Sequence, residues 1–305
     1  MRDDTPLPRP PLGPRHWPMW LALASMMVAA RLPWTLQRLL GRGLGALAFA
    51  LAGSRRRAAA TNLDLCLPER SPGERATLLR DSFRDLGVGF LEFARAWWGD
   101  ATPMRRTARI EGVEAIEAIL AQGRGVLLVS GHFMTLEMCG RLMCDRLPLA
   151  GMYRRHRSPV FEWAVRRGRQ RYAVAMFANE EVRPAIRHLK QGGILWYAPD
   201  QDMRGKDTVF APFFGVPAAT ITATHQFARL SGCAVVPFFH RREGADYVLR
   251  LGEPLADFPS KDVAADTARV NAAIEAMVRE APSQYLWIHR RFKRRPDGEA
   301  PPYGN

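Results

Sequence analysis

The chain has 305 residues, 47% of them hydrophobic, so it can bury a substantial core and is not a disordered tail. Its 44 Lys and Arg outnumber its 30 Asp and Glu, giving a net charge of +14 that suits phosphates, acidic proteins or anionic lipid head groups. Nucleic acid is disfavoured as a partner, because the basic residues lie beside no zinc-finger spacing, RNA-binding signature or helix-turn-helix pattern.

The amino-terminal region, residues 1–60, is the part with membrane character. After a polar, proline-rich leader, Trp17 to Ala30 run for fourteen residues without a charge. Such a helix is roughly 21 Å long, less than the roughly 30 Å hydrocarbon core of a bilayer. A second apolar segment, interrupted by arginines, extends to Gly53. Four interpretations of this region are compatible with the pattern: a signal-anchor helix, a pair of helices lying in the membrane interface, a buried hairpin, or a cleaved signal peptide. The polar leader fits a signal peptide poorly.

Residues 61–296 read as one α/β domain with a helical lead-in. Apolar residues recur at helical spacing between Asn62 and Trp98, with a capped start near Ser71. Short strand-like runs then alternate with helical stretches; the expected strands are 125–130, 149–153, 173–177, 193–198, 234–240 and 246–251, and the expected helices pass through 138–142, 161–171, 182–191 and 221–231. This alternation predicts a mixed or mostly parallel sheet covered by helices, followed by a flexible tail at 297–305.

Polar clusters follow three of the expected strands. They are Ser130-Gly131-His132, Arg154-Arg155-His156-Arg157 and Pro199-Asp200-Gln201-Asp202. Ligands of open α/β sheets bind outside the carboxyl ends of the strands. The three clusters therefore indicate a single site.

The segment SGHFMTLE, residues 130–137, contains a histidine and a glutamate five positions apart. If His132 precedes the helix, its ring can take a proton from a hydroxyl while Glu137 orients the ring. A hydrogen-bonded junction between strand and helix explains the same residues without catalysis. The pair alone does not choose between these interpretations.

The sequence shows no nucleophilic serine and no common metal site. Ser130 lacks the context of a nucleophilic serine, which favours transfer to a substrate hydroxyl over a covalent enzyme intermediate. The cysteines at 66, 139, 144 and 233 form no CxxC pair, and the order His-x6-Cys-x4-Cys from His132 matches no common zinc site. We therefore expect neither a disulfide framework nor a metal or other cofactor.

The arginines after the second of these strands favour a phosphorylated substrate. Arg154 and Arg157 lie in one short cluster, and Arg169 belongs to a second basic run on the following helix. Guanidinium groups bind phosphate in a bidentate manner, although a solvated basic loop is the simpler alternative. Asp200 would order these arginines or the acceptor, or only cap a turn.

The segment VFAPFFGVP, residues 209–217, is too aromatic for an ordinary surface loop. If exposed, Phe210, Phe213 and Phe214 would line a groove for an acyl chain or enter lipid. If buried, they are core residues.

Taken together, SGHFMTLE, the Tyr153-Arg154 dipeptide, YAPDQD, VFAPFFGVPAAT and YLWIHRRFKRRP resemble the lipid A biosynthesis acyltransferase family. This family of lauroyl and myristoyl transferases belongs to the wider His-x4-Asp/Glu glycerolipid acyltransferases. The resemblance implies a chain anchored at the cytoplasmic face of the inner membrane, in contact with anionic lipids. It would move an acyl group from acyl carrier protein to a hydroxyl of a phosphorylated lipid A precursor.

Carried over by position, the resemblance makes His132 the general base and Glu137 its partner. It assigns Arg154 and Asp200 to substrate positioning, and we group Arg157, Arg169 and Gln201 with them. An acidic carrier protein and a phosphorylated glycolipid both suit the positive charge of the chain. The alternatives are an acyltransferase with a glycerophospholipid or glycosylated phosphoinositide acceptor, or a membrane lipid-binding protein without activity.

Overall fold

The computed structural model describes residues 7, 9–202 and 207–303. The start of the predicted polar leader and the last two residues of the predicted tail lie outside this description. The described residues form an α/β fold with a seven-stranded sheet in the order β1-β9-β8-β2-β5-β3-β4, and a separate two-stranded sheet, β6-β7. The predicted α/β class with a mostly parallel sheet is confirmed.

The sheet is parallel except where β8 meets β9. Its strands are β1 (Arg109–Glu111), β2 (Val126–Val129), β3 (Leu149–Tyr153), β4 (Ala175–Ala178), β5 (Ile194–Tyr197), β8 (Ala234–Glu243) and β9 (Asp246–Leu251). Every residue of β2 is buried. Val126 and Leu128 belong to one apolar core and Leu127 and Val129 to another, as expected for a strand covered on both faces.

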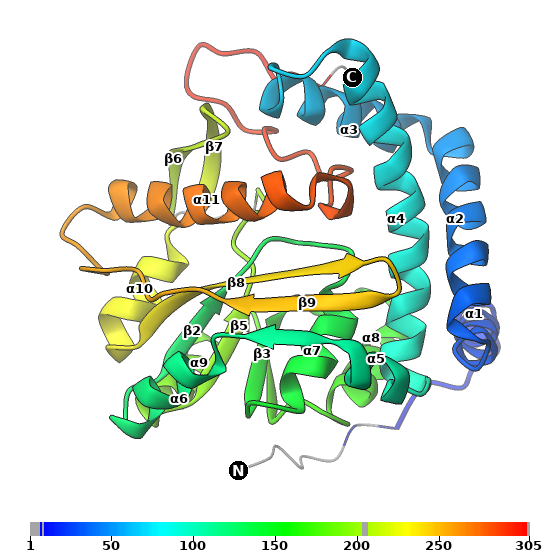
Figure 1. Ribbon diagram of the computed structural model, residues 1–305, viewed down its shortest axis with the longest axis horizontal. Helices are drawn as coiled ribbons and strands as arrows, with labels where there is room; N and C mark the ends of the chain where they lie inside the picture. The colour runs from blue at the N-terminus through cyan, green and yellow to red at the C-terminus, as the bar shows by residue number, and fades with distance from the viewer. Residues whose placement is uncertain (1–6, 8, 203–206, 304–305) are drawn as a thin grey trace.

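Helices cover both faces of the sheet (Figure 1). Residues of α5 (Thr102–Thr107), α6 (Val113–Ala121), α7 (Leu136–Cys144) and α8 (Pro159–Arg169) contribute to the first core. Residues of α9 (Val182–Lys190), α10 (Ala223–Ser231) and α11 (Val263–Glu280) contribute to the second. The hairpin of β6 (Thr208–Phe213) and β7 (Val216–Ile221) packs against α11.

The amino-terminal helices are α1 (Trp17–Ala29), α2 (Trp34–Leu51), α3 (Gly53–Cys66) and α4 (Pro72–Trp98). Figure 1 shows α4 standing between the sheet and α2. The contact between α2 and α4 is close, because Gly45 lies directly on the α4 backbone: a Cβ atom there would be 2.1 Å from the carbonyl oxygen of Phe83. Across the described residues we find no helix with the length and apolar character needed to cross a bilayer.

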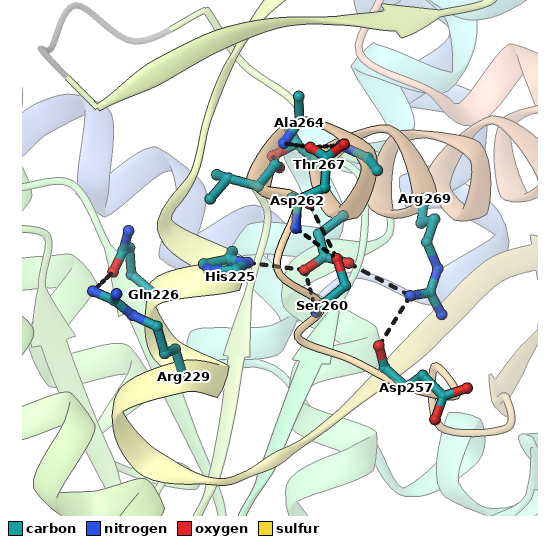
Figure 2. A network of polar contacts seen from close by, with 12 residues as sticks. His225, Gln226, Arg229, Asp257, Ser260, Asp262, Ala264, Thr267 and Arg269 are labelled. Atoms are coloured by element: carbon teal, nitrogen blue, oxygen red, sulfur yellow. Dashed lines mark hydrogen bonds and ion pairs between the residues drawn. The ribbon is translucent and has the colours of Figure 1, made fainter.

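A buried polar network joins α10 to α11, as Figure 2 shows. The Asp266 carboxylate of α11 lies 2.8 Å from Nδ1 of His225 and accepts a hydrogen bond from the Ser260 backbone N–H at 2.7 Å. Asp262 caps the start of α11 by accepting from the backbone N–H groups of Ala264 and Ala265. These contacts hold α10, α11 and the loop that precedes α11 together.

The carboxyl-terminal segment returns to the amino-terminal helices. The Tyr303 hydroxyl accepts from the Phe292 backbone N–H at 3.0 Å and donates to Oδ1 of Asn62 in α3. The predicted loose tail is thus attached at Tyr303.

Candidate active site

The site is built where β2 and β5 end side by side. These strands pair in parallel through Val129 and Tyr197, so the residues that follow them meet at one edge of the sheet. Residues 130–135 form a loop between β2 and α7, and His132 lies in this loop ahead of the helix. The predicted placement of His132 is confirmed.

His132 is paired with Asp200. Nδ1 of His132 lies 2.5 Å from one Asp200 carboxylate oxygen, and the His132 backbone N–H donates to the other at 2.9 Å. Asp200 is fully buried, whereas 31% of the His132 side chain is exposed. Because Nδ1–H donates to Asp200, Nε2 carries the lone pair that can accept a proton.

The pKa values of this pair are shifted by burial and by each other. Burial disfavours the charged imidazolium, but the Asp200 charge and hydrogen bond outweigh it and raise the pKa of His132 above 6.5. Burial also disfavours the Asp200 carboxylate. The His132 ring, its backbone N–H and the Tyr285 hydroxyl overcome that effect and lower the pKa of Asp200 to about 2. Asp200 therefore stabilises the imidazolium that forms when Nε2 of His132 accepts a proton.

Glu137 does not orient His132, and the predicted pairing is corrected here. Glu137 lies in the first turn of α7 and is buried among three donors, which are the Arg169 guanidinium, the Trp97 indole N–H at 2.7 Å and the Tyr172 hydroxyl at 2.9 Å. The first turn of α7 points Glu137 towards Trp97 of α4 and Arg169 of α8, whereas the loop ahead of α7 brings His132 to Asp200. Asp200, which was assigned to substrate positioning, is the carboxylate that holds the ring.

A cavity beside His132 is closed by the carboxyl-terminal segment and α3. Its lining residues are Asn62, Cys66, His132, Asp200, Gln201, Phe213, Tyr285, Leu286, Trp287, His289, Arg291 and Phe292. The backbone holds the walls together, because Leu286 N–H donates to the His132 carbonyl at 2.9 Å and Met134 N–H donates to Gln284 at 2.8 Å. Gln201 thus lies at the cavity, and its contact with substrate stays a prediction.

The predicted arginines have different environments. Arg154 and Arg157 are exposed in the loop after β3, which pairs with β5 and so ends at the same edge of the sheet. Arg169 instead forms an ion pair with Glu137, and its guanidinium lies 5.8 Å from the centroid of the Tyr153 ring. Arg154 and Arg157 are therefore accessible to a substrate, whereas Arg169 is occupied by its ion pair with Glu137.

The three phenylalanines predicted to line an acyl groove differ in their exposure. Phe210 is 46% exposed, Phe213 is buried and lines the cavity, and Phe214 is packed between Phe213 and Trp287. Phe214 and Gly215 have φ values of 53° and 72° at the turn of the hairpin, so this turn requires the left-handed region twice. The hairpin places Phe213 inward, and Phe214 is a core residue.

Most residues that line the cavity were not predicted as site residues, and three of these carry a hydroxyl, an imidazole or an amide group. They are Tyr285, His289 and Asn62, all of which line the cavity. Burial lowers the pKa of His289 to about 4, so its ring is neutral. The segment YLWIHRRFKRRP contained two of them, but no spacing in the sequence indicates that it returns to β2 and β5.

Comparisons with known proteins show the family of the chain. Residues 10–294 match the family model described as bacterial lipid A biosynthesis acyltransferase. The chain is 38% identical to the Escherichia coli lipid A biosynthesis lauroyltransferase, over 94% of this chain and 95% of that protein. It is 37% identical to the palmitoleoyltransferase of the same organism, over 96% of both chains, and 32% identical to a Haemophilus influenzae lipid A biosynthesis acyltransferase, over 95% of this chain and 94% of that one. The chain is an acyltransferase and belongs to the bacterial lipid A biosynthesis acyltransferase family.

Proposed function

We propose that the protein transfers a fatty acyl group from an acyl carrier protein thioester to a hydroxyl of a phosphorylated lipid A precursor. The observation that carries the proposal is the His132–Asp200 pair at the cavity, in a chain whose residues 10–294 match the lipid A acyltransferase family. A base with a free lone pair and a buried carboxylate behind it is the arrangement that activates a hydroxyl.

In the proposed reaction, Nε2 of His132 takes the proton of the acceptor hydroxyl as its oxygen attacks the thioester carbonyl carbon. The tetrahedral intermediate collapses with cleavage of the C–S bond, and the imidazolium returns the proton to the leaving thiolate. Asp200 holds the ring in the required tautomer and stabilises the imidazolium that forms. The protein's own residues supply the acid–base chemistry of both steps.

The charge of the protein supports both proposed substrates. Arg154 and Arg157 are exposed at the edge of the sheet where His132 lies, and they suit the phosphates of the acceptor. A net charge of +14 favours encounter with an acidic carrier protein. Gln201 lines the cavity and would hold a polar group of the acceptor.

Apolar side chains lie beside the proposed base, around a cavity that is much smaller than an acyl chain. Phe213, Trp287 and Phe292 provide apolar walls, and Phe210 exposes part of its ring on the same hairpin. The length of the acyl chain stays open, because the lauroyl- and palmitoleoyltransferases are 38% and 37% identical to this chain.

We further propose that α1 and α2 lie on the cytoplasmic face of the inner membrane. Their exposed large apolar residues are Trp17, Leu21, Met27, Val28, Leu36, Leu39, Leu40, Leu44, Leu47 and Leu51. Arg38 and Arg42 on α2 would meet anionic head groups at the same depth. This arrangement needs no helix of spanning length.

Purified protein tests the proposal when it is supplied with labelled acyl carrier protein thioester or acyl-CoA and with either a phosphorylated lipid A precursor or a glycerophospholipid. Mass spectrometry of the products should show one acyl group added to the lipid A precursor, and from the carrier protein thioester in preference. His132→Ala should abolish the transfer while circular dichroism stays native. Acylation of the glycerophospholipid alone would overturn the proposed acceptor, and an unchanged rate for His132→Ala would overturn the proposed base.

A further inference from the structure

His240 of β8 is a fully buried histidine bonded at both ring nitrogens to the loop that carries His132. Nε2 lies 3.2 Å from the Ser130 hydroxyl, and Nδ1 lies 2.8 Å from the Thr135 hydroxyl. Ser130 and Thr135 are the two ends of the loop between β2 and α7. One imidazole therefore bridges both ends of the segment on which His132 sits.

The hydrogen bonds determine the tautomer of His240. The Ser130 hydroxyl donates to the Gly131 carbonyl at 3.2 Å, so its oxygen accepts from Nε2–H of His240. Nδ1 is then the acceptor for the Thr135 hydroxyl. Burial lowers the pKa of His240 to about 3, which keeps the ring neutral and both bonds intact near neutral pH.

The ring cannot move to another position, because aromatic side chains enclose it. The ring centroids of Phe133, Phe238 and Trp196 lie 5.5, 5.3 and 5.3 Å away. Such packing holds the imidazole in one rotamer, and the imidazole in turn holds two hydroxyls.

We infer that His240 is a positioning residue for acyl transfer, which fixes the loop 130–135 so that Nδ1 of His132 stays on Asp200 and Nε2 faces the cavity. The inference rests on the proposed role of His132 as the base. His240 contacts neither His132 nor the substrate site directly and acts through Ser130 and Thr135. Small displacements of a catalytic group are costly, since a shift of about 1 Å can reduce a rate about a hundredfold.

The test removes the two hydrogen bonds from either side. His240→Leu removes both at similar volume, and the double substitution Ser130→Ala/Thr135→Val removes the same two from the loop. Each should lower kcat about ten- to a hundredfold with KM changed less than about threefold. The triple variant His240→Leu/Ser130→Ala/Thr135→Val should have a kcat no lower than that of the slower of these two variants. Both sets of substitutions remove the same two hydrogen bonds, so their effects should not add.

The pH dependence supplies a readout that a purely structural role would not change. The acid limb of kcat/KM reports the pKa of His132, which is raised above 6.5 while the ring stays on Asp200. A loosened loop should move that limb to lower pH. Should His240→Leu fail to fold, the single variant Thr135→Val carries the same expectation with a smaller change.

His225→Asn is the matched control, because His225 is also buried and hydrogen-bonded but joins α10 to α11 in the network of Figure 2. It should lower the melting temperature and leave kcat and the acid limb of the folded enzyme unchanged. If His132→Ala is inactive while His240→Leu and Thr135→Val keep the wild-type kcat and acid limb, the positioning role is overturned and the base assignment stands. If His132→Ala keeps its rate, both fail.

Discussion

At the residue scale, the buried carboxylates of Asp200 and Glu137 have different roles. Asp200 contacts the ring and backbone of His132, whereas Glu137 accepts from Arg169, Trp97 and Tyr172. The first tunes the proposed base, and the second anchors α7 to α4 and α8. Sequence spacing suggested Glu137 because it is close in the chain, but Asp200 is close in space because β2 and β5 are neighbours.

Replacing Asp200 by Asn should lower kcat by about a hundredfold or more, because the amide neither favours the required tautomer nor stabilises the imidazolium. Asp202→Asn is a matched control, since Asp202 follows two residues later and its side chain is also buried but pairs with Arg294. Steady-state acyl transfer by both variants checks this. Comparable loss in the two would show that the segment matters rather than the Asp200 carboxylate.

The ion pair of Arg169 and Glu137 makes a separate prediction about stability. The exposed fractions of the two side chains are 16% and 1%, and removing one partner of such a pair costs about 3–5 kcal/mol. Arg169→Met should lower the free energy of unfolding in urea by that amount. Arg105→Met, which breaks the more exposed pair with Asp145, should cost under about 1 kcal/mol. Equal losses would contradict the account of Glu137 as an anchor.

At the scale of elements, the packing of α2 on α4 depends on glycine. Gly41 of α2 lies against Gly87 and Val88 of α4, and Gly45 lies against Phe83. Neither position leaves room for a Cβ atom. Gly45→Ala should therefore destabilise the protein by about 1–3 kcal/mol through overpacking. Gly43→Ala is the control: nothing lies within 4 Å of the added atom, and the substitution should stabilise the helix by up to about 1 kcal/mol. Differential scanning calorimetry of both variants distinguishes them, and a stable Gly45→Ala would contradict the packing.

The strand–helix alternation was predictable because each strand is a short apolar run between turn residues. All six expected strands and the four expected helices were found to within a few residues. The hairpin β6-β7 was not predicted, because Pro212 and Pro217 interrupt its alternation and its pairing becomes visible only in three dimensions. For the same reason the return of residues 285–292 to His132 could not be predicted: it depends on contacts between segments more than 150 positions apart.

At the scale of the whole molecule, the amino-terminal helices α1 and α2 expose many large apolar side chains. Leu39, Leu47 and Leu51 are 66%, 55% and 75% exposed on α2, which lies on the side of α4 away from the sheet in Figure 1. Substituting all three by Gln should weaken binding to vesicles with anionic lipids at least tenfold, since burying one leucine contributes about 1.5–3 kcal/mol. Leu230→Gln, on the exposed face of α10, is the control and should bind as the wild type does. Flotation assays measure both, and unchanged binding of the triple variant would contradict the interfacial arrangement.

The central claim, that His132 is a general base held by Asp200, is tested most directly by the pH dependence of kcat/KM. The base must be neutral to act, so activity should fall as the pH drops through the raised pKa of His132, above 6.5. Asp200→Asn removes the charge that raises this pKa while burial, which lowers it, remains; the acid limb should therefore move to lower pH. Glu137→Gln should leave the limb in place. A limb that stays fixed in Asp200→Asn, or moves in Glu137→Gln, would contradict the account.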